Sequence, residues 1–377
     1  MKQIFLGADL FDGERIIKDH ALVLEDGLIK ALVPFSERPH DSEIIDLAGG
    51  ILSPGFIDIQ VNGGGGTLFN EDPTLEGIAA IADAHRRFGT TALLPTVITD
   101  HQKIIDDALR ATQSAREIRR DIAGIHVEGP FIDVVRKGAH PANYIRALTQ
   151  ADIDHFAEAR SGVLLLTVAP NKVTADQITA LTRAGIHVSL GHSDATDLEA
   201  KAAIDAGARA VTHLFNAMSQ CEGRAPGLVG SALADPRVIC GLIADGHHVA
   251  PTAIIAALAA KGAEGIALIS DAMPSAAGGP VHFTLQSRLV RRQNKKLTLD
   301  DGTLAGADIT MFDAVNYMLS LGIPLAYVLQ MATRTPARLI GLEGQIGALR
   351  PGYPADIVHL GPDHRLLGVF YGGKRLD

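Results

Sequence analysis

Cysteine is scarce in this sequence. Cys221 and Cys240 are the two cysteines among 377 residues, and they do not form a Cys-x-x-Cys pair. Two distant cysteines are too few for a disulfide framework, and they lack the spacing of a cysteine-based metal or redox site. We therefore expect a protein of a reducing compartment, the cytoplasm.

Long apolar runs and concentrated positive charge are also lacking. The most apolar run, 253–260, is far shorter than the roughly 20 residues that span a bilayer, and the first residues show no signal-peptide core. The formal net charge is -9, which argues against a nucleic-acid partner because phosphate backbones need clustered cations. Arg291, Arg292, Lys295 and Lys296 do group together, in a polar segment typical of a hairpin turn. We expect neither a membrane nor a nucleic acid as partner.

Both ends of the chain are rich in short β-type runs. Asp-Gly turns at Asp12 and Asp26 separate such runs in the first fifty residues, and the last thirty residues show the same pattern. Neither end could bury a core alone. We therefore expect 1–53 and 345–377 to pair into one small β-sandwich domain, with the rest of the chain inserted between them.

The middle of the chain, 54–344, alternates apolar β-type runs with helical patterns. The expected strands are 56–61, 91–97, 124–128, 163–168, 187–190, 210–213, 239–244 and 266–271. Eight such units predict an α/β fold, a (β/α)₈ TIM-like barrel whose active site lies at the C-terminal strand ends. An open doubly wound sheet is the alternative, but no G-x-G-x-x-G follows the first strand.

Four polar residues fall at the expected C-terminal strand ends: Glu128, His192, His213 and Asp271. A carboxylate and two imidazoles are typical ligands of a hydrolytic metal site with an open position, where the ion lowers the pKa of bound water to about 7. Asp271 then remains to move the proton. A single histidine after a strand is more often structural, so the prediction depends on the four together. His126 could be a further ligand or a structural residue.

Several motifs give the chain a family resemblance. The barrel boundaries at 54–58 and 347–356 resemble those of the amidohydrolase superfamily. Seven further motifs lie along almost the whole chain: Gln60-Val61-Asn62-Gly63, His126-Val127-Glu128-Gly129-Pro130-Phe131, Lys137-Gly138-Ala139-His140, Gly191-His192-Ser193-Asp194-Ala195-Thr196, Thr212-His213-Leu214-Phe215-Asn216-Ala217-Met218, Asp245-Gly246-His247-His248-Val249 and Ser270-Asp271-Ala272. Through these motifs the chain resembles, more narrowly, the N-acetylglucosamine-6-phosphate deacetylases.

The resemblance implies a reaction and roles for residues. The reaction is hydrolysis of N-acetylglucosamine 6-phosphate to glucosamine 6-phosphate and acetate. Glu128, His192 and His213 would bind the metal, Asp271 would be the acid and base, and His140 would polarise the acetamide carbonyl. The implied substrate contacts are Ala139, Asn216, Ala217, Arg224, His248, Leu304, Ala305 and Gly306. Of these, Arg224 and His248 would reach in from a neighbouring subunit, which implies a homodimer.

The sequence also departs from the family pattern. Gln60 and Asn62 stand where the wider superfamily has a His-x-His pair, and an amide is a poor substitute for imidazole as a ligand. We therefore expect a vacant second-metal position and one ion per subunit, with Zn²⁺ favoured and Fe²⁺, Co²⁺ or Mn²⁺ also suited. Asn171 and Ala225 stand where family members usually have glutamate, which leaves the exact sugar specificity open.

Two other functions remain open. One is a deacetylase of another phosphorylated N-acetyl amino sugar, or another amidohydrolase such as an N-acyl amino acid hydrolase. Replacement of Arg224 should separate these, because a phosphate-reading enzyme loses affinity mainly for phosphorylated substrates. The other is a catalytically silent barrel that serves as a scaffold, which the missing histidine pair suggests. Metal analysis should distinguish this scaffold from an enzyme.

Overall fold

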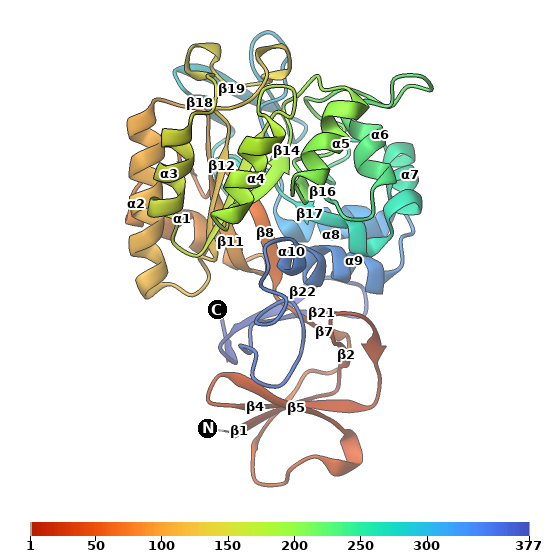
Figure 1. Ribbon diagram of the computed structural model, residues 1–377. Coiled ribbons are helices and arrows are strands. Elements are labelled where there is room, and N and C mark those ends of the chain that lie inside the picture. The colour runs from red at the N-terminus through yellow and green to blue at the C-terminus, as the bar shows by residue number, and fades with distance from the viewer. Residues whose placement is uncertain (1, 377) are drawn as a thin grey trace.

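A parallel β-barrel forms the larger part of the molecule. The computed structural model describes residues 2–376, and its barrel stands above a smaller β-rich part (Figure 1). In order around the sheet, the strands are β8 (Phe56–Val61), β11 (Thr90–Ile98), β12 (Gly124–Glu128), β13 (Val163–Val168), β14 (His187–Leu190), β15 (Ala210–Val211), β16 (Ile239–Ile243) and β17 (Ile266–Ile269). A parallel bridge between Val61 and Ala272 joins the first strand to the segment after the last. The predicted eight-stranded barrel is confirmed.

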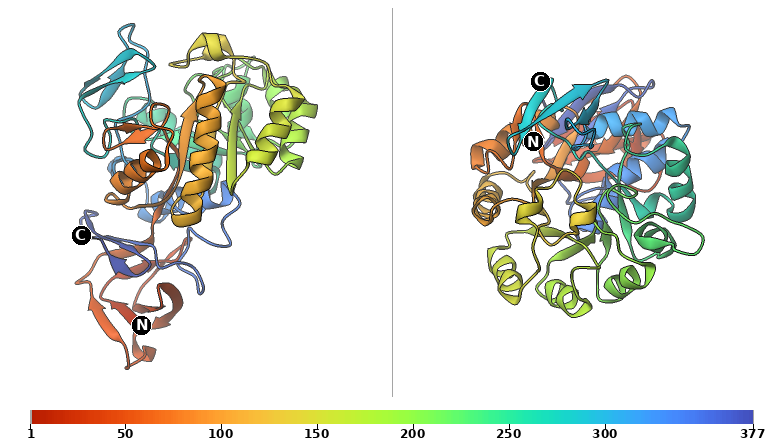
Figure 2. Two further views of the ribbon diagram at one scale, coloured as in Figure 1. Left: turned by 90° about the vertical axis from the view of Figure 1, so that its left-hand side faces the viewer. Right: turned by 90° about the horizontal axis from the view of Figure 1, so that it is seen from above.

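Helices surround this barrel, as the view along its axis shows (Figure 2, right). They are α1 (Leu75–Arg86), α2 (Gln102–Ile118), α3 (Gln150–Ala159), α4 (Ala175–Arg183), α5 (Asp197–Asp205), α6 (Gly227–Ala234), α7 (Pro251–Lys261), α8 (Met311–Ser320), α9 (Leu325–Ala332) and α10 (Arg334–Leu339). Threonine begins several of them. Thr149, Thr174, Thr196 and Thr310 each accept from the third helical N–H in a capping box, which satisfies donors that the helix itself leaves free.

The two ends of the chain build the smaller part together. One sheet has the order β5-β4-β1-β6 and the other β23-β22-β21-β7-β2-β3. Their bounds are β1 (Lys2–Leu6), β2 (Asp9–Phe11), β3 (Ile16–Ile17), β4 (His20–Glu25), β5 (Leu28–Pro34), β6 (Glu43–Asp46), β7 (Ile51–Pro54), β21 (Ile357–Leu360), β22 (Leu366–Tyr371) and β23 (Lys374–Arg375). Phe5, Leu22, Leu52 and Phe370 share one buried cluster between them. The sheets from both ends are as predicted, whereas the exact domain boundaries at 53 and 344 remain a proposal.

A third small sheet lies at the end of the barrel away from the terminal β domain (Figure 2, left). It contains β18 (His282–Leu285), β19 (Arg288–Gln293) and β20 (Lys296–Thr298). The turn at Asn294 and Lys295 joins the last two strands, so the basic cluster does mark a hairpin. The remaining elements are β9 (Gly63–Gly64), β10 (Thr67–Leu68) and the 3₁₀ turns η1 (Phe35–Glu37), η2 (Val134–Arg136), η3 (Ala142–Tyr144) and η4 (Ala263–Gly265). Within residues 2–376, no helix has the length and apolarity to cross a membrane.

Candidate active site

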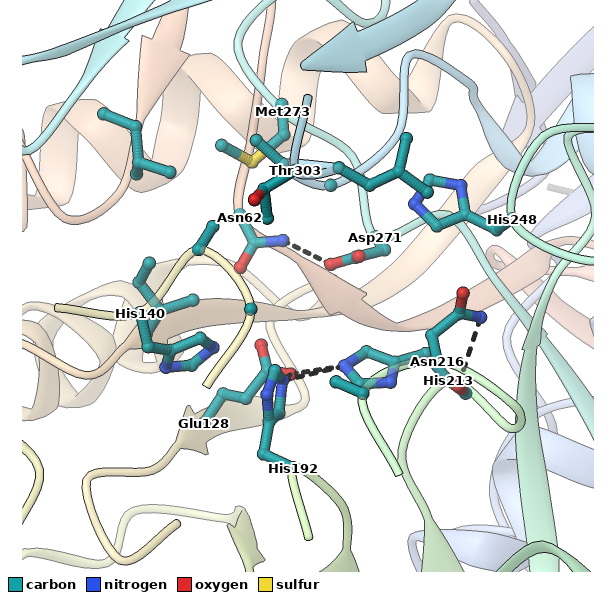
Figure 3. A pocket seen from close by; sticks show the side chains of 18 of the residues that line it. Asn62, Glu128, His140, His192, His213, Asn216, His248, Asp271, Met273 and Thr303 are labelled. Carbon is teal, nitrogen blue, oxygen red and sulfur yellow. Dashed lines mark hydrogen bonds and ion pairs between the residues drawn. The ribbon is translucent and has the colours of Figure 1, made fainter. Parts of the chain in front are cut away.

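A cavity of about 370 Å³ opens at the C-terminal ends of the barrel strands (Figure 3). Its volume lies within the usual range for small-molecule sites. Residues from many strand ends and from the loop after β20 line it: Asn62, Glu128, Arg136, Ala139, His140, His192, His213, Asn216, Ala217, His248, Asp271, Thr303, Leu304, Ala305 and Gly306, among others. The four residues of the predicted metal and proton-transfer site therefore meet in one place, although they are far apart in sequence.

Three potential metal ligands converge in this cavity. The Nε2 atoms of His192 and His213 lie 3.0 Å apart, and they lie 3.1 and 3.0 Å from Oε1 of Glu128. All three side chains are buried. Bonds of about 2.0–2.1 Å to one tetrahedral ion would place the ligand atoms roughly 3.3 Å apart. The donor set therefore fits one divalent cation.

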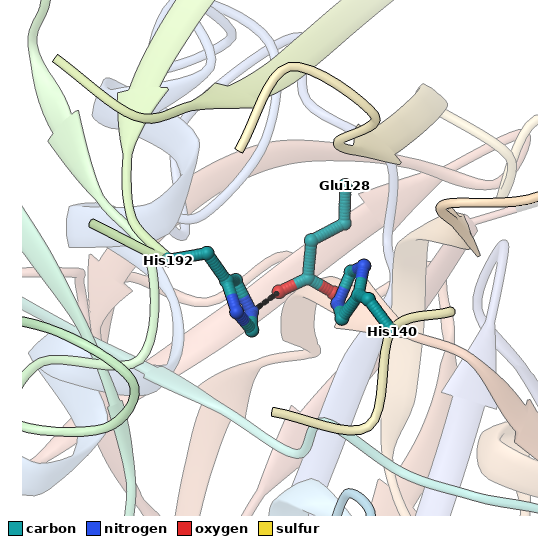
Figure 4. Close-up of side chains that lie close together, drawn as sticks. All are labelled: Glu128, His140 and His192. Atoms are coloured by element: carbon teal, nitrogen blue, oxygen red, sulfur yellow. Dashed lines mark hydrogen bonds and ion pairs between the residues drawn. The ribbon is translucent and has the colours of Figure 1, made fainter. Parts of the chain in front are cut away.

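His140 is a further imidazole beside this set. Ligand atoms of Glu128, His140 and His192 all lie within 4.8 Å of one another (Figure 4), so His140 could replace His213 in a Glu/His/His group. His213 is closer, however, with its Nε2 about 3 Å from both other donors. His140 also hydrogen-bonds through Nδ1 with Thr99 Oγ1 at 2.8 Å. The distances favour His213 as the third ligand, with His140 next to the ion.

Further contacts hold His192 and Glu128 in the forms that bind a cation. The carbonyl oxygen of Arg136 accepts from Nδ1 of His192 at 2.8 Å, which leaves Nε2 with a free lone pair. Burial opposes ionisation of Glu128, but its contacts with the imidazoles of His192 and His213 hold its pKa well below the usual range. An anionic carboxylate and a neutral imidazole with Nε2 free are the forms that bind metal.

The backbone is unusual at three of these positions. His192, His213 and Asp271 have φ angles of 47°, 30° and 49°, in the left-handed region that few non-glycine residues adopt. Such conformations cost about 1–3 kcal/mol each and cluster at functional sites. Two strands, β15 and β17, end two residues earlier than predicted, at Val211 and Ile269 respectively. His213 and Asp271 therefore lie just beyond regular strand structure, where the backbone can turn their side chains into the cavity.

Two amides hold Asp271. Its Oδ1 accepts from Nδ2 of Asn62 at 2.6 Å and from Nε2 of Gln60 at 3.1 Å. Burial and the nearby charge of Glu128 raise the pKa of Asp271 to about 6, against the opposing effect of His213. A carboxyl group that titrates near neutral pH can both accept and donate a proton.

Gln60 also links the two carboxylates. Its Nε2 lies 3.2 and 3.3 Å from the two oxygens of Glu128, in addition to its contact with Asp271. Amide hydrogens thus lie between the carboxylates at the position where the wider superfamily pattern has imidazoles. The residue types suggested a vacant second-metal position, but the bridge itself was not predicted.

His126 has a different environment from the other histidines. It is buried on β12, its Nε2 lies 2.7 Å from Thr167 Oγ1, and it does not line the cavity. Burial lowers its pKa to about 4. Of the two interpretations of His126, the structure favours the structural one.

Most of the predicted substrate contacts face the cavity, and Arg224 does not. Ala139, Asn216, Ala217, His248, Leu304, Ala305 and Gly306 line the cavity, whereas Arg224 is exposed in the loop before α6. His248 differs from the prediction, because it lines the cavity of its own chain. Asp245 Oδ2 lies 2.6 Å from its Nδ1 and holds the ring there.

The two glutamate replacements lie outside the cavity. Asn171 donates to Asp133 at 2.5 Å and accepts from Ser193 at 2.7 Å, so it connects the loops that follow β12 and β14. Ala225 is exposed in the same loop as Arg224. Neither change alters the cavity lining directly. Three supporting residues had no predicted role: Thr99, Arg136 and Asp245 hold His140, His192 and His248 respectively.

Known proteins resemble this chain over its full length. Residues 51–376 match the amidohydrolase family, and residues 5–52 match the NagA composite domain. An N-acetylgalactosamine-6-phosphate deacetylase of Shewanella sp. (strain ANA-3) is 40% identical, with 98% of this chain and 95% of the relative covered. An N-acetylglucosamine-6-phosphate deacetylase of Haemophilus influenzae is 32% identical, with 99% of each covered.

A solved structure agrees with these relatives. The crystal structure of N-acetylglucosamine-6-phosphate deacetylase from Pasteurella multocida superposes with a TM-score of 0.96 at 33% identity, and all of both chains is covered. The fold, the cavity at the strand ends and the sequence matches agree, and this chain belongs to the amidohydrolase family.

Proposed function

We propose that this protein hydrolyses the N-acetyl group of N-acetylglucosamine 6-phosphate and releases glucosamine 6-phosphate and acetate. The observation that carries the proposal is the meeting of Glu128, His192 and His213 within about 3 Å of one another, with Asp271 in the same cavity. Relatives in bacteria and mammals bear the name of this activity.

The metal part of the proposal is one divalent ion per subunit, held by Glu128, His192 and His213. Zn²⁺ is the favoured ion, and Fe²⁺, Co²⁺ and Mn²⁺ suit the same donors. When bound, such an ion would polarise the acetyl carbonyl and lower the pKa of a water molecule.

Asp271 is proposed to carry the proton. Both amides that reach it, Gln60 and Asn62, donate to Oδ1, so Oδ2 is the oxygen proposed to accept the proton of the attacking water. A pKa of about 6 makes Asp271 a stronger base than an ordinary aspartate, and the protonated carboxyl group is still acidic enough to give this proton to the leaving amine nitrogen. Asn62 and Gln60 keep the carboxyl group oriented during both transfers.

His140 is proposed to stabilise the oxyanion. Burial, together with the neighbouring His192, lowers its pKa well below the usual range, so the imidazole is neutral. A neutral ring can donate one hydrogen bond to developing negative charge in a buried site, where such bonds are strongest. The sugar would then contact Ala139, Asn216, Ala217, His248 and the loop 304–306.

The assembly is part of the same proposal. Because Arg224 is exposed and lies outside its own cavity, we place it at the cavity of a second subunit in a homodimer. A guanidinium group there can bind phosphate in a bidentate manner. We assign the protein to the cytoplasm, where both cysteines would remain free thiols.

A second candidate substrate is N-acetylgalactosamine 6-phosphate. The Shewanella relative with this activity in its name is 40% identical to this chain, more than the Haemophilus relative at 32%. Both sugars carry the same acetamide and phosphate groups, so the metal and Asp271 would act alike on either.

The test is acetate release from four substrates: N-acetylglucosamine and N-acetylgalactosamine, each with and without the 6-phosphate. We expect the highest kcat/KM for N-acetylglucosamine 6-phosphate. A higher value for the galactosamine compound would establish the second candidate instead. Acetate release from none of the four by metal-loaded protein would contradict the proposed reaction.

A further inference from the structure

Arg136 is the one lysine or arginine among the residues of the described chain, 2–376, that line the cavity. It ends η2, in the loop that follows β12. The family resemblance implies that Arg224 binds the substrate phosphate, but Arg224 lies outside this cavity. A phosphate dianion is bound most strongly by charged hydrogen-bond donors. Arg136 is therefore a candidate donor to the substrate phosphate.

The main chain of Arg136 is fixed to the reaction centre. Its carbonyl oxygen accepts from His192 Nδ1 at 2.8 Å, and the N–H of Asp133, three residues earlier, donates to the carbonyl oxygen of His192 at 2.9 Å. The loop is thus bound to a metal ligand at both points. These two hydrogen bonds therefore fix the position of the Arg136 backbone, from which the guanidinium group extends, relative to His192.

The side chain of Arg136 has an exchangeable partner. Its Nε and Nη2 lie 2.8 and 2.7 Å from the same oxygen, Oδ1 of Asp194. The ion pair therefore lacks the bidentate geometry in which two nitrogens contact two carboxylate oxygens. The side chains are 38% and 45% exposed. Exposed pairs of this kind contribute about 0–1 kcal/mol, so a phosphate with more negative charge can take the place of Asp194.

The location of Asp194 also matches the expected phosphate position. The N–H of Ser193, the preceding residue, donates to the carbonyl oxygen of Ala217 at 3.1 Å, and the N–H of Ser219 donates to Ser193 at 3.0 Å. The segment around Asp194 therefore runs beside Asn216 and Ala217, which were predicted to hold the sugar phosphate. The Arg136–Asp194 pair lies next to that segment.

We propose that Arg136 binds the substrate phosphate from within the same chain, by exchanging Asp194 for the phosphate when the sugar enters. This inference rests on the proposed function and adds a residue that determines specificity for phosphorylated sugars. It does not require the second subunit, and Arg224 would act in addition to it.

The test compares Arg136→Ala with wild type on N-acetylglucosamine with and without the 6-phosphate. The expected result is a rise in KM of roughly 10- to 100-fold for the phosphorylated sugar, the effect of losing a charged hydrogen bond, with kcat and metal content little changed. Inorganic phosphate, used as a competing inhibitor, should lose affinity by a similar factor. The KM of Arg136→Lys should lie between those of wild type and Arg136→Ala, because lysine keeps the positive charge but cannot bind phosphate in a bidentate manner.

Two further variants serve as controls. Arg146→Ala removes a guanidinium of the same β12–α3 segment that is paired with Asp152 and lies outside the cavity, and it should leave KM unchanged. Asp194→Asn removes the competing carboxylate and should lower KM for the phosphorylated sugar. An unchanged KM and phosphate affinity in Arg136→Ala would overturn the inference, as would an equal loss on both sugars with loss of metal. Failure of wild type to deacetylate any phosphorylated sugar would instead contradict the proposed function.

Discussion

Asp271 has two properties that a proton carrier needs, namely a pKa raised to about 6 and fixed hydrogen bonds to Oδ1. Asp271→Asn keeps the shape of the side chain but removes the group that exchanges a proton. We expect normal metal content, because Asp271 is not among the three proposed ligands, and a fall in kcat of roughly 10²- to 10⁴-fold. Steady-state kinetics and metal analysis of the same sample measure both. Near-normal turnover would remove Asp271 from the mechanism.

Asp58 gives a prediction about stability. It is fully buried on β8, accepts from the N–H groups of Gln60 and Ser270, and burial raises its pKa to about 7. Because the pKa in the unfolded chain is near 3.8, the unfolded state releases the proton first as pH rises. The contribution of Asp58 to stability is therefore greatest at acidic pH and is lost as pH approaches 7.

Asp58→Asn should keep the oxygen acceptor and remain neutral at every pH. We expect the free energy of unfolding of this variant to fall less between pH 5 and pH 8 than that of wild type. Urea denaturation at several pH values measures the difference, with the exposed Asp41→Asn as matched control. Parallel pH profiles of wild type and Asp58→Asn would show that Asp58 is ionised in the folded protein or does not affect stability.

Some individual residues of the site were predictable and others were not. Glu128, His192, His213 and Asp271 follow apolar strand patterns, so their convergence follows from the barrel. The amide of Gln60 between Glu128 and Asp271 did not follow, because a sequence shows residue types without showing which side chains touch. The contacts of Asn171 with Asp133 and Ser193 were hidden for the same reason.

At the scale of elements, we expect the end of β8 to limit the number of metal ions that the site can hold. Gln60 and Asn62 point amides at Glu128 and Asp271, and amides are weak ligands for transition metals. The double change Gln60→His and Asn62→His would supply two imidazoles beside both carboxylates. We expect wild type to bind one ion per chain and the double variant to bind two.

Metal analysis after dialysis against a limited excess of Zn²⁺ counts the ions. Asn70→His is a suitable control, because Asn70 is buried and lines the same cavity but hydrogen-bonds to Asp100 and the main chain of Ile98 and not to Glu128 or Asp271. This control should still bind one ion. A single ion in the double variant, with its fold intact by circular dichroism, would show that the end of β8 does not limit the metal count.

Elements with a strong pattern were predicted well. β8, β12, β13 and β14 have the expected bounds, because each is a short run in which apolar residues are continuous or recur at alternate positions. β15 and β17 are shorter than expected, since His213 and Asp271 need left-handed backbone that strands exclude. Propensity and periodicity describe regular structure, and the functional residues lie where regular structure ends.

For the molecule as a whole, the pairing of both chain ends into one β-rich part was predictable, because neither end could bury a core alone. The small sheet β18–β20 was foreseen only as a hairpin. Its apolar residues, such as Leu285 and Val290, pack with Met273 and Leu68 from the barrel, and this contact has no signature in local sequence. The inward position of His248 likewise depends on Asp245.

The proposed dimer gives the last prediction. If Arg224 reaches the cavity of the partner subunit, each site contains Asp271 from one subunit and Arg224 from the other. Arg224→Ala and Asp271→Asn then remove residues that the two different subunits contribute to one site. In a mixed dimer, the Asp271→Asn subunit supplies an intact Arg224 to the cavity that still has Asp271. One complete site then forms per mixed dimer, because the two-fold interface uses each surface twice.

We therefore expect two weakly active variants to recover activity when their subunits are exchanged. Random exchange of equal amounts makes half of the dimers mixed, each with one complete site of two, which gives about a quarter of wild-type activity at low substrate concentration. Activity equal to the mean of the separate variants, with exchange verified by differently tagged subunits, would show that Arg224 does not act across an interface. Arg136 would then remain the proposed phosphate ligand, because it is the lysine or arginine among the residues that line the cavity of its own chain.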